Sequence, residues 1–131
     1  MKLENLFEMY TALVLDGRSR RFLRKTFPPK YPDFIGHHIT MKFGVPKDTP
    51  KPSQPKTVEV VGHKYDDERG VEALVVAVNG KTKRPDGSTY HVTWSIDKSK
   101  GAKPVHSNNM LKGGFDKVDP IAIKISPELL Q

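Results

Sequence analysis

Two short segments of the chain repeat one pattern of side chains that could carry out acid–base chemistry. The segment 38–41 reads His-Ile-Thr-Met, and the segment 91–94 reads His-Val-Thr-Trp. An imidazole titrates near neutral pH, so one histidine can accept a proton while a second one donates a proton. A threonine hydroxyl can donate a hydrogen bond to a phosphate oxygen. The two segments together contain what phosphodiester cleavage needs: a base, an acid and phosphate ligands.

Strand geometry gives the spacing a physical meaning. Alternate side chains of a strand point to opposite faces, so His38 and Thr40 would share one face, as would His91 and Thr93. We expect these four residues to face a cleft and the apolar residues between them to face the core, Trp94 included. A lone strand histidine is more often structural than catalytic, but a matched pair favours catalysis. The four are therefore our candidate catalytic residues.

Further residues near the motifs are candidates for substrate binding. Tyr10, at the edge of the first expected strand, could stack on a base. Lys42 would share the cleft face of Thr40 and could pair with a phosphate. Ser107, in the loop after the second motif, is the third candidate.

The three other histidines are not expected to be catalytic. We expect His37 on the opposite strand face from the first motif, and His63 in a solvated loop, because its neighbouring acidic residues match no metal-site spacing known to us. His106 could contact substrate or lie on a surface loop. We predict no metal ligands.

The elements that must position these residues follow from hydrophobic patterning. Residues 10–16, 37–45, 57–62, 71–79, 90–96 and 120–126 have strand-like composition or alternation, residues 18–27 have helical spacing, and Ser107 could cap a short helix over 108–112. The Pro-Asp-Gly sequence at 85–87 is turn chemistry and predicts an antiparallel hairpin of 71–79 with 90–96. These patterns predict an α+β, two-lobed fold with mostly antiparallel sheets, short helices and a central cleft carrying both motif strands.

The 131 residues suit a single domain. Four prolines between residues 46 and 56 indicate an exposed connector. The expected organisation is a first lobe over about 1–45, the connector 46–56 and a second lobe over about 57–131.

The composition limits which kinds of partner and site the chain can have. The net charge of +7 favours a polyanionic partner, with a nucleotide or nucleic acid as the first candidate. The absence of cysteine excludes disulfides, thiolate metal sites and a cysteine nucleophile. No apolar run approaches the roughly 20 residues of a membrane span. Glu4 and Glu8 interrupt any signal-peptide-like stretch, so we expect a cytoplasmic protein.

On its two motifs the sequence resembles the 2H phosphoesterase superfamily. That superfamily has two His-x-Thr/Ser motifs, each followed by a hydrophobic residue, on strands of a two-lobed antiparallel fold. The strand–helix–strand order of residues 10–43 resembles the first lobe, and residues 71–96 resemble the second, although no helix is evident between 57 and 90. The resemblance implies that His38, Thr40, His91 and Thr93 are catalytic and that neither a metal nor another cofactor is needed. Some compact members are RNA-end cyclic phosphodiesterases and others are phage proteins that degrade cyclic nucleotide immune signals. The loop 101–108 of this chain looks similar to both groups.

Several functions remain open at this point. The leading hypothesis is a metal-independent phosphodiesterase for a cyclic nucleotide, such as a cyclic oligonucleotide immune messenger, acting in the host cytoplasm if it is phage-encoded. The alternatives are an RNA-end 2′,3′-cyclic phosphodiesterase, a non-catalytic RNA- or nucleotide-binding module and a basic structural protein of a larger assembly. The sequence does not decide which histidine is the acid, nor the oligomeric state.

Overall fold

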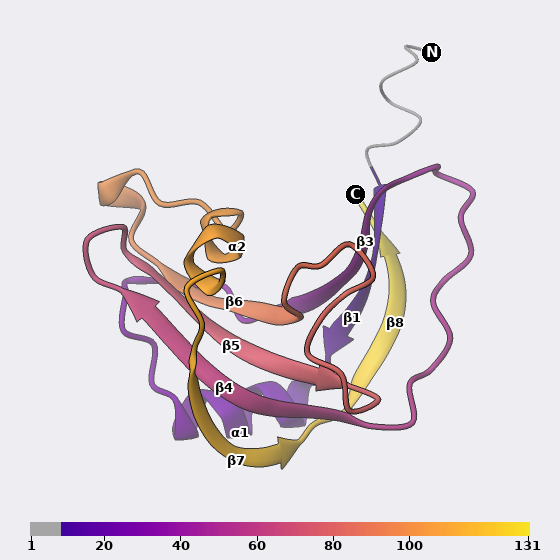
Figure 1. The fold of residues 1–131 in the computed structure, drawn as a ribbon, viewed down its shortest axis with the longest axis horizontal. Helices are drawn as coiled ribbons and strands as arrows, with labels where there is room; N and C mark the ends of the chain where they lie inside the picture. Colours follow the sequence, from indigo (N-terminus) through magenta and orange to yellow (C-terminus); the bar gives the residue numbers. More distant parts are fainter. Residues whose placement is uncertain (1–8) are drawn as a thin grey trace.

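The computed structural model describes residues 9–131, and residues 1–8, on which the signal-peptide argument rests, lie outside the described part. The fold is α+β, as expected: mostly antiparallel strands and two short α-helices (Figure 1). The strands are β1 Met9–Leu15, β2 Asp33–Phe34, β3 His38–Val45, β4 Val58–Asp66, β5 Val71–Val78, β6 His91–Ile96, β7 Asp116–Ala122 and β8 Ile125–Leu130. The helices are α1 Gly17–Thr26 and α2 His106–Leu111, with a short 3₁₀ turn, η2, at Lys98–Lys100.

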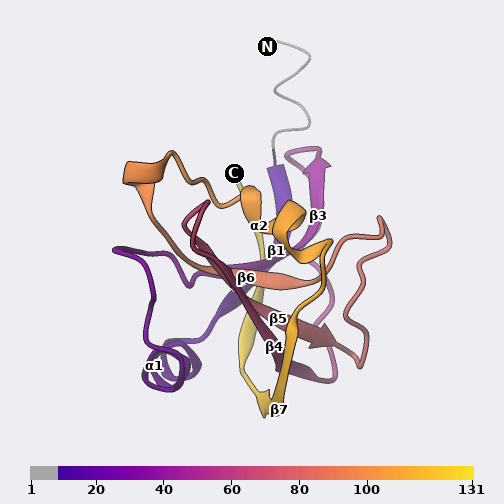
Figure 2. The same ribbon diagram turned by 60° about the vertical axis from the view of Figure 1, so that its left-hand side comes forward.

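One eight-stranded sheet runs through the described residues in the order β7-β4-β5-β6-β3-β1-β8, and β2 pairs with β6 beside β3. The sheet is strongly curled (Figure 2). The motif strands β3 and β6 are neighbours at its centre, where the half built on β1, β3 and β8 meets the half built on β4, β5, β6 and β7. This pairing brings together two segments that are far apart in the sequence.

The C-terminal region differs from the expected single strand over 120–126. It forms two strands, β7 and β8, which pair with β4 and β1 at opposite edges of the sheet. The chain crosses between the edges at Ile123 and Lys124, where Ile123 N donates to the Val58 carbonyl at 3.0 Å and Asp16 N donates to the Lys124 carbonyl at 3.0 Å. Each of the two edge strands contains a proline, which an edge position tolerates because one side of the strand has no ladder to complete.

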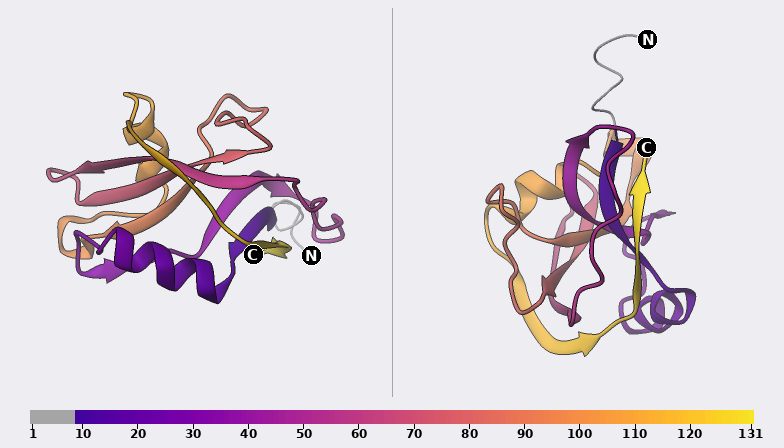
Figure 3. Two further views of the ribbon diagram at one scale, coloured as in Figure 1. Left: turned by 90° about the horizontal axis from the view of Figure 1, so that it is seen from below. Right: turned by 90° about the vertical axis from the view of Figure 1, so that its right-hand side faces the viewer.

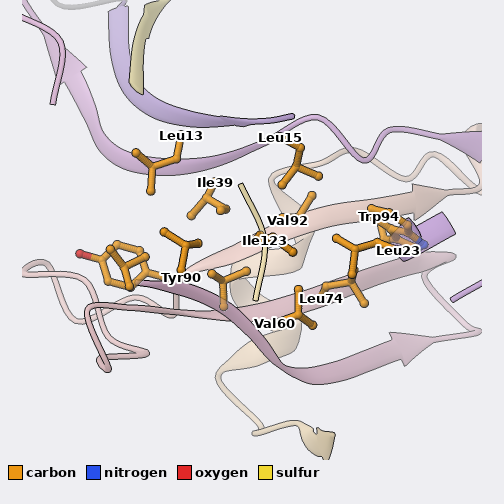
Figure 4. Packing of buried hydrophobic residues seen from close by; sticks show 13 residues of the cluster. Leu13, Leu15, Leu23, Ile39, Val60, Leu74, Tyr90, Val92, Trp94 and Ile123 are labelled. Carbon is orange, nitrogen blue, oxygen red and sulfur yellow. The ribbon is translucent and has the colours of Figure 1, made fainter. Parts of the chain in front are cut away.

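Two apolar clusters cover opposite faces of the sheet. Inside the curl, side chains of β1 and β3 face those of β4, β5 and β6, and the fully buried Trp94 lies beside Leu23 at one end of the cluster (Figure 4). Leu23 anchors α1 to this cluster, and the Asp16 carboxylate caps the helix by accepting from Arg18 N at 3.1 Å. The second cluster joins α2 to the outer face of β5, so the two helices lie on opposite sides of the sheet (Figure 3). Strand β5 is buried on both faces, which explains its continuous apolar run.

The hairpin expected from the turn at 85–87 is present, since β5 and β6 pair antiparallel across the loop 79–90. Strand β4 continues past the predicted end at residue 62. Val61 is an extra residue of this strand, and after this bulge the residues from Gly62 onward remain paired with β5. His63 therefore lies in a strand and not in a solvated loop, and its Nε2 is 2.8 Å from a carboxylate oxygen of Glu72. Residues 46–57 contain no helix or strand.

Among residues 9–131, no helix is long and apolar enough to cross a membrane.

Candidate active site

The two motifs lie directly opposite each other in the sheet. Ile39 of β3 pairs with Val92 of β6 in antiparallel orientation. One step along each strand, this register sets His38 opposite Thr93 and Thr40 opposite His91. The four candidate catalytic residues thus form a square with approximate twofold symmetry, and the two histidines occupy one diagonal.

Each motif is followed by the same irregularity of the sheet. Thr11 pairs with Lys42 and Ala12 with Thr40, so Met41 is an extra residue in β3. Glu72 pairs with Ser95 and Ala73 with Thr93, so Trp94 is an extra residue in β6. Such a bulge bends the strand and changes which side chains reach a face. The residue after each His-x-Thr triplet therefore marks the end of simple alternation in both strands.

A pocket of about 520 Å³ opens over this square. Its wall includes Tyr10, both motif histidines and both motif threonines, in agreement with the expected cleft. Two further segments complete it: the loop 79–90 between β5 and β6, and the segment 104–108, which includes the first turn of α2. The lining residues that the sequence did not single out are Ile35, Phe43, Arg84, Ser88, Pro104, Val105 and Asn108.

His91 is held by the loop that leads into its strand. Its Nδ1 lies 2.8 Å from the carbonyl oxygen of Thr89, and only 9% of the residue is exposed. Burial lowers the pKa of His91, the bond to Thr89 raises it, and the nearby charge of Arg84 lowers it, with a net lowering. Since a carbonyl only accepts, Nδ1 carries a proton and Nε2 is left for a ligand.

His38 is held by two other rings. Its Nδ1 lies 3.0 Å from Nδ1 of His37, and the Tyr10 ring packs against it at a centroid distance of 5.3 Å. Burial, with the positive charges of His37 and His91, lowers the pKa of His38 to about 4. The expectation that His37 lies on the opposite face was wrong: it precedes the first residue of β3, where strand alternation does not yet apply.

Ser107 lies behind the second motif and not in the pocket wall. It is fully buried, and its Oγ lies 3.0 Å from Thr93 Oγ1, which also donates to the Pro104 carbonyl at 3.2 Å. The prediction that Ser107 caps a helix is also wrong, because Ser107 is inside α2 and the residue at the N-cap is Val105. Ser107 can therefore orient the Thr93 hydroxyl, whereas direct contact with a substrate would require a rearrangement.

Phe43 takes the position expected for Lys42. The bulge at Met41 turns Lys42 out to solvent, where it does not line the pocket, and brings Phe43 opposite Tyr10. The Phe43 and Tyr10 rings are stacked at a centroid distance of 6.1 Å. The same effect in β6 turns Ser95 away from the motif face, where its Oγ donates to a Glu72 oxygen at 2.6 Å.

Arg84 supplies the positive charge that was expected from Lys42. The turn that contains Pro85 aims it back over β3, where its Nη1 donates to the Thr40 carbonyl at 3.3 Å. The carboxylate of Asp86 holds the guanidinium at 3.2 Å, and the Arg84 side chain is only 8% exposed. Its only signal in the sequence was its place in the turn before the second motif.

No protein-family model, curated protein or solved structure matches the chain. Within the described range 9–131, no three His, Asp or Glu side chains are grouped so as to hold a metal ion. The pocket offers two imidazoles with Nε2 directed away from their supporting contacts, two threonine hydroxyls and one guanidinium. These groups could bind a phosphate diester and move protons on either side of it.

Proposed function

We propose that this protein is a phosphodiesterase that hydrolyses a nucleotide phosphodiester by acid–base catalysis between His38 and His91, without a metal. The observation that carries the proposal is the register Ile39–Val92, which makes one square of two separate His-x-Thr motifs in the wall of one pocket. In-line displacement at phosphorus needs a base near the entering oxygen and an acid near the leaving oxygen. Two histidines on the diagonal of the square are suited to these two roles.

Phosphate binding would rest on Arg84 and the threonines. A guanidinium can hold two phosphate oxygens at once, and in a largely buried position its charge is poorly screened by solvent. Thr40 lies beside it, since the Thr40 carbonyl accepts from Arg84. The Thr40 hydroxyl would donate to a non-bridging oxygen as negative charge builds up on it. The Thr93 hydroxyl has one proton, so it would do the same by exchanging its bond to the Pro104 carbonyl for one to the phosphate.

The rest of the pocket favours a nucleotide as the carrier of that phosphate. Tyr10 and Phe43 provide stacked aromatic surface next to His38, on which a base could stack. The volume of about 520 Å³ is in the range of small-molecule sites. Together with the resemblance of both motifs to 2H phosphoesterases, this supports a cyclic nucleotide substrate, with a cyclic oligonucleotide messenger as first choice and a 2′,3′-cyclic RNA end as the alternative.

The test is a hydrolysis assay over a substrate panel in the presence of EDTA. The panel contains 2′,3′-cyclic mononucleotides, an RNA with a cyclic end and several cyclic di- and trinucleotides. We expect turnover of at least one class by the wild type and a loss of several orders of magnitude in the His38→Ala, His91→Ala double variant. The class that is cleaved decides between messenger degradation and RNA-end processing.

Two results would contradict the proposal. One is turnover that EDTA abolishes, and the other is turnover that survives in the double variant. Binding of a panel member without any turnover would instead favour a non-catalytic nucleotide-binding module.

A further inference from the structure

The two catalytic candidates differ at the nitrogen that faces away from the ligand. His91 Nδ1 meets a backbone carbonyl, which can only accept a hydrogen bond. His38 Nδ1 meets another imidazole nitrogen, Nδ1 of His37, which can donate or accept. The supporting contact of a histidine determines which ring nitrogen carries the proton, and therefore what its other nitrogen can do.

We propose that His37 is a positioning residue that makes His38 the proton donor of the reaction, leaving His91 as the base. This inference rests on the proposed phosphodiesterase function and assigns its two roles. With Nδ1 protonated against the Thr89 carbonyl, neutral His91 has its lone pair on Nε2 and can accept a proton. When His37 Nδ1–H donates to His38 Nδ1, neutral His38 carries its proton on Nε2 and can give it away.

The step balances with these three residues and one solvent proton. His91 Nε2 takes the proton of the attacking hydroxyl, from water or from a ribose, as the new oxygen–phosphorus bond forms. The bond from phosphorus to the leaving oxygen breaks, and that oxygen receives the Nε2 proton of His38. His38 Nδ1 simultaneously receives the Nδ1 proton of His37, and His37 Nε2 takes a proton from solvent, so neither ring becomes an imidazolate. Both rings of the pair end neutral with their protons on the opposite nitrogens, and His91 is left cationic.

The positions of the His37 and His38 rings suit these two roles. His37 is exposed, so its Nε2 can exchange protons with solvent, and the pair is reset when His38 Nε2 takes up a proton, the Nδ1 proton returns to His37 and His37 Nε2 releases one. His38 is more buried, and burial with the neighbouring charges lowers its pKa, which favours a neutral ring with a single proton. The carbonyl of His37 accepts from Leu15 N at 2.9 Å, so the backbone of His37 is held by β1 independently of its ring.

A change of leaving group distinguishes the general acid from the general base, because only the acid protonates the leaving oxygen. The substrates are the best alkoxide-leaving member of the panel and uridine 3′-(p-nitrophenyl phosphate), whose leaving group departs without a proton. We expect His38→Ala to lower kcat/KM about 10²- to 10⁴-fold on the alkoxide substrate and less than about tenfold on the nitrophenyl ester. His91→Ala should impair both substrates equally. The opposite pattern would overturn the assignment.

His37 variants test the relay itself. His37→Ala should follow His38→Ala, with loss on the alkoxide substrate alone and partial rescue by added imidazole, which can reach an exposed position. His37→Asn retains an N–H donor but cannot pass on a proton, so it should keep the tautomer of His38 and still lose rate on the alkoxide substrate. Unchanged activity of both variants on that substrate would refute a role for His37.

Nitrogen-15 NMR of the imidazole rings gives a readout that does not depend on turnover. At neutral pH we expect the proton on Nε2 in His38 and on Nδ1 in His91, and a shift of His38 toward mixed tautomers in His37→Ala but not in His37→Asn. Turnover combined with a protonated Nδ1 on His38 would overturn this inference alone. The expected tautomers without turnover of any phosphodiester would overturn the proposed function and, with it, the role of His37 in catalysis.

Discussion

Two cations lie near the bulge at Met41: Lys42, which follows it in β3, and Arg84, which contacts the Thr40 carbonyl from the loop 79–90. Their surroundings differ sharply. The Arg84 side chain is 8% exposed, lines the pocket and touches the Thr40 carbonyl. Lys42 is exposed and does not line the pocket. Solvent and salt screen an exposed charge much more strongly than a buried one. The two residues therefore make a matched pair, because each substitution removes one positive charge from the chain.

We predict that Arg84→Ala lowers kcat/KM for the phosphodiester by about 10²-fold or more, because a pre-oriented donor to the phosphate is lost. Lys42→Ala should change kcat/KM less than about threefold, which reflects long-range attraction alone. Steady-state kinetics at two salt concentrations would measure both effects. Equal losses in the two variants would mean that Arg84 acts only through the net charge.

At the scale of elements, the segment between α1 and β3, which includes β2, determines the positions of Ile35, His37 and His38. Its fixed points include Arg20, which donates from Nε to the Gly36 carbonyl at 2.7 Å, and the amide of Gly36, which donates to the Thr93 carbonyl at 3.0 Å. Gly36 has a φ of +47°, and a Cβ there would lie 2.5 Å from the Phe34 ring. A side chain at this position would strain the approach of the first motif to the second.

The same loop is anchored at its start by a buried carboxylate. Glu72 of β5 is 1% exposed and accepts from Lys30 N at 3.0 Å, from Ser95 Oγ at 2.6 Å and, on its other oxygen, lies 2.8 Å from His63 Nε2. Its hydrogen bonds from these partners lower the pKa of Glu72 against the opposing effect of burial, which is the largest single influence. The network joins β4, β5, β6 and the loop on the face away from the pocket.

We predict that Glu72→Ala lowers the free energy of unfolding by about 3–5 kcal/mol, because it leaves several buried partners unpaired. Glu72→Gln keeps an acceptor for Ser95 and Lys30 and should cost less, about 1–3 kcal/mol. The control is Glu68→Ala, at an exposed turn position, which should stay within about 0.5 kcal/mol. Urea unfolding followed by the fluorescence of the buried Trp94 would measure all three. A Glu72→Ala variant as stable as the control would refute the structural role of the network.

For the whole molecule, the site places two histidines in surroundings that favour their neutral forms. The pKa of His38 is lowered from 6.5 to about 4, and that of His91 is lowered as well. Between pH 6.5 and about 4 the His38 ring binds a proton in the unfolded chain but not in the folded chain, so a lower pH favours unfolding. The contribution of these histidines to stability is complete above pH 6.5 and is lost as the pH falls toward about 4.

We therefore predict that the urea midpoint falls as the pH is lowered from 6.5 to about 5, before the carboxylates of the unfolded chain, with ordinary pKa values of about 4, take up protons. His38→Gln should reduce this slope, because glutamine does not titrate. A midpoint that stays constant across the window in the wild type would contradict the burial of these imidazoles in their neutral form.

What the sequence determined by itself was local. The alternation of apolar and polar residues marked β3 and β6, and strand-like composition marked β1 and β5. The Pro-Asp-Gly turn marked the hairpin, because all these signals depend on neighbours a few positions apart. The same alternation was enough to identify His38, Thr40, His91 and Thr93 as residues of one face in each strand.

Tertiary structure decided what depends on partners distant in the sequence. The pairing of Ile39 with Val92, the separation of β7 from β8 and the approach of Arg84 to Thr40 each join residues that no local pattern relates. The bulges at Met41 and Trp94 exist only relative to the neighbouring strands, so the exchange of Lys42 for Phe43 could not be read from β3 alone. His37 shows the same dependence: its contact with His38 arises where the loop enters the strand, next to the Gly36 carbonyl that Arg20 holds from α1.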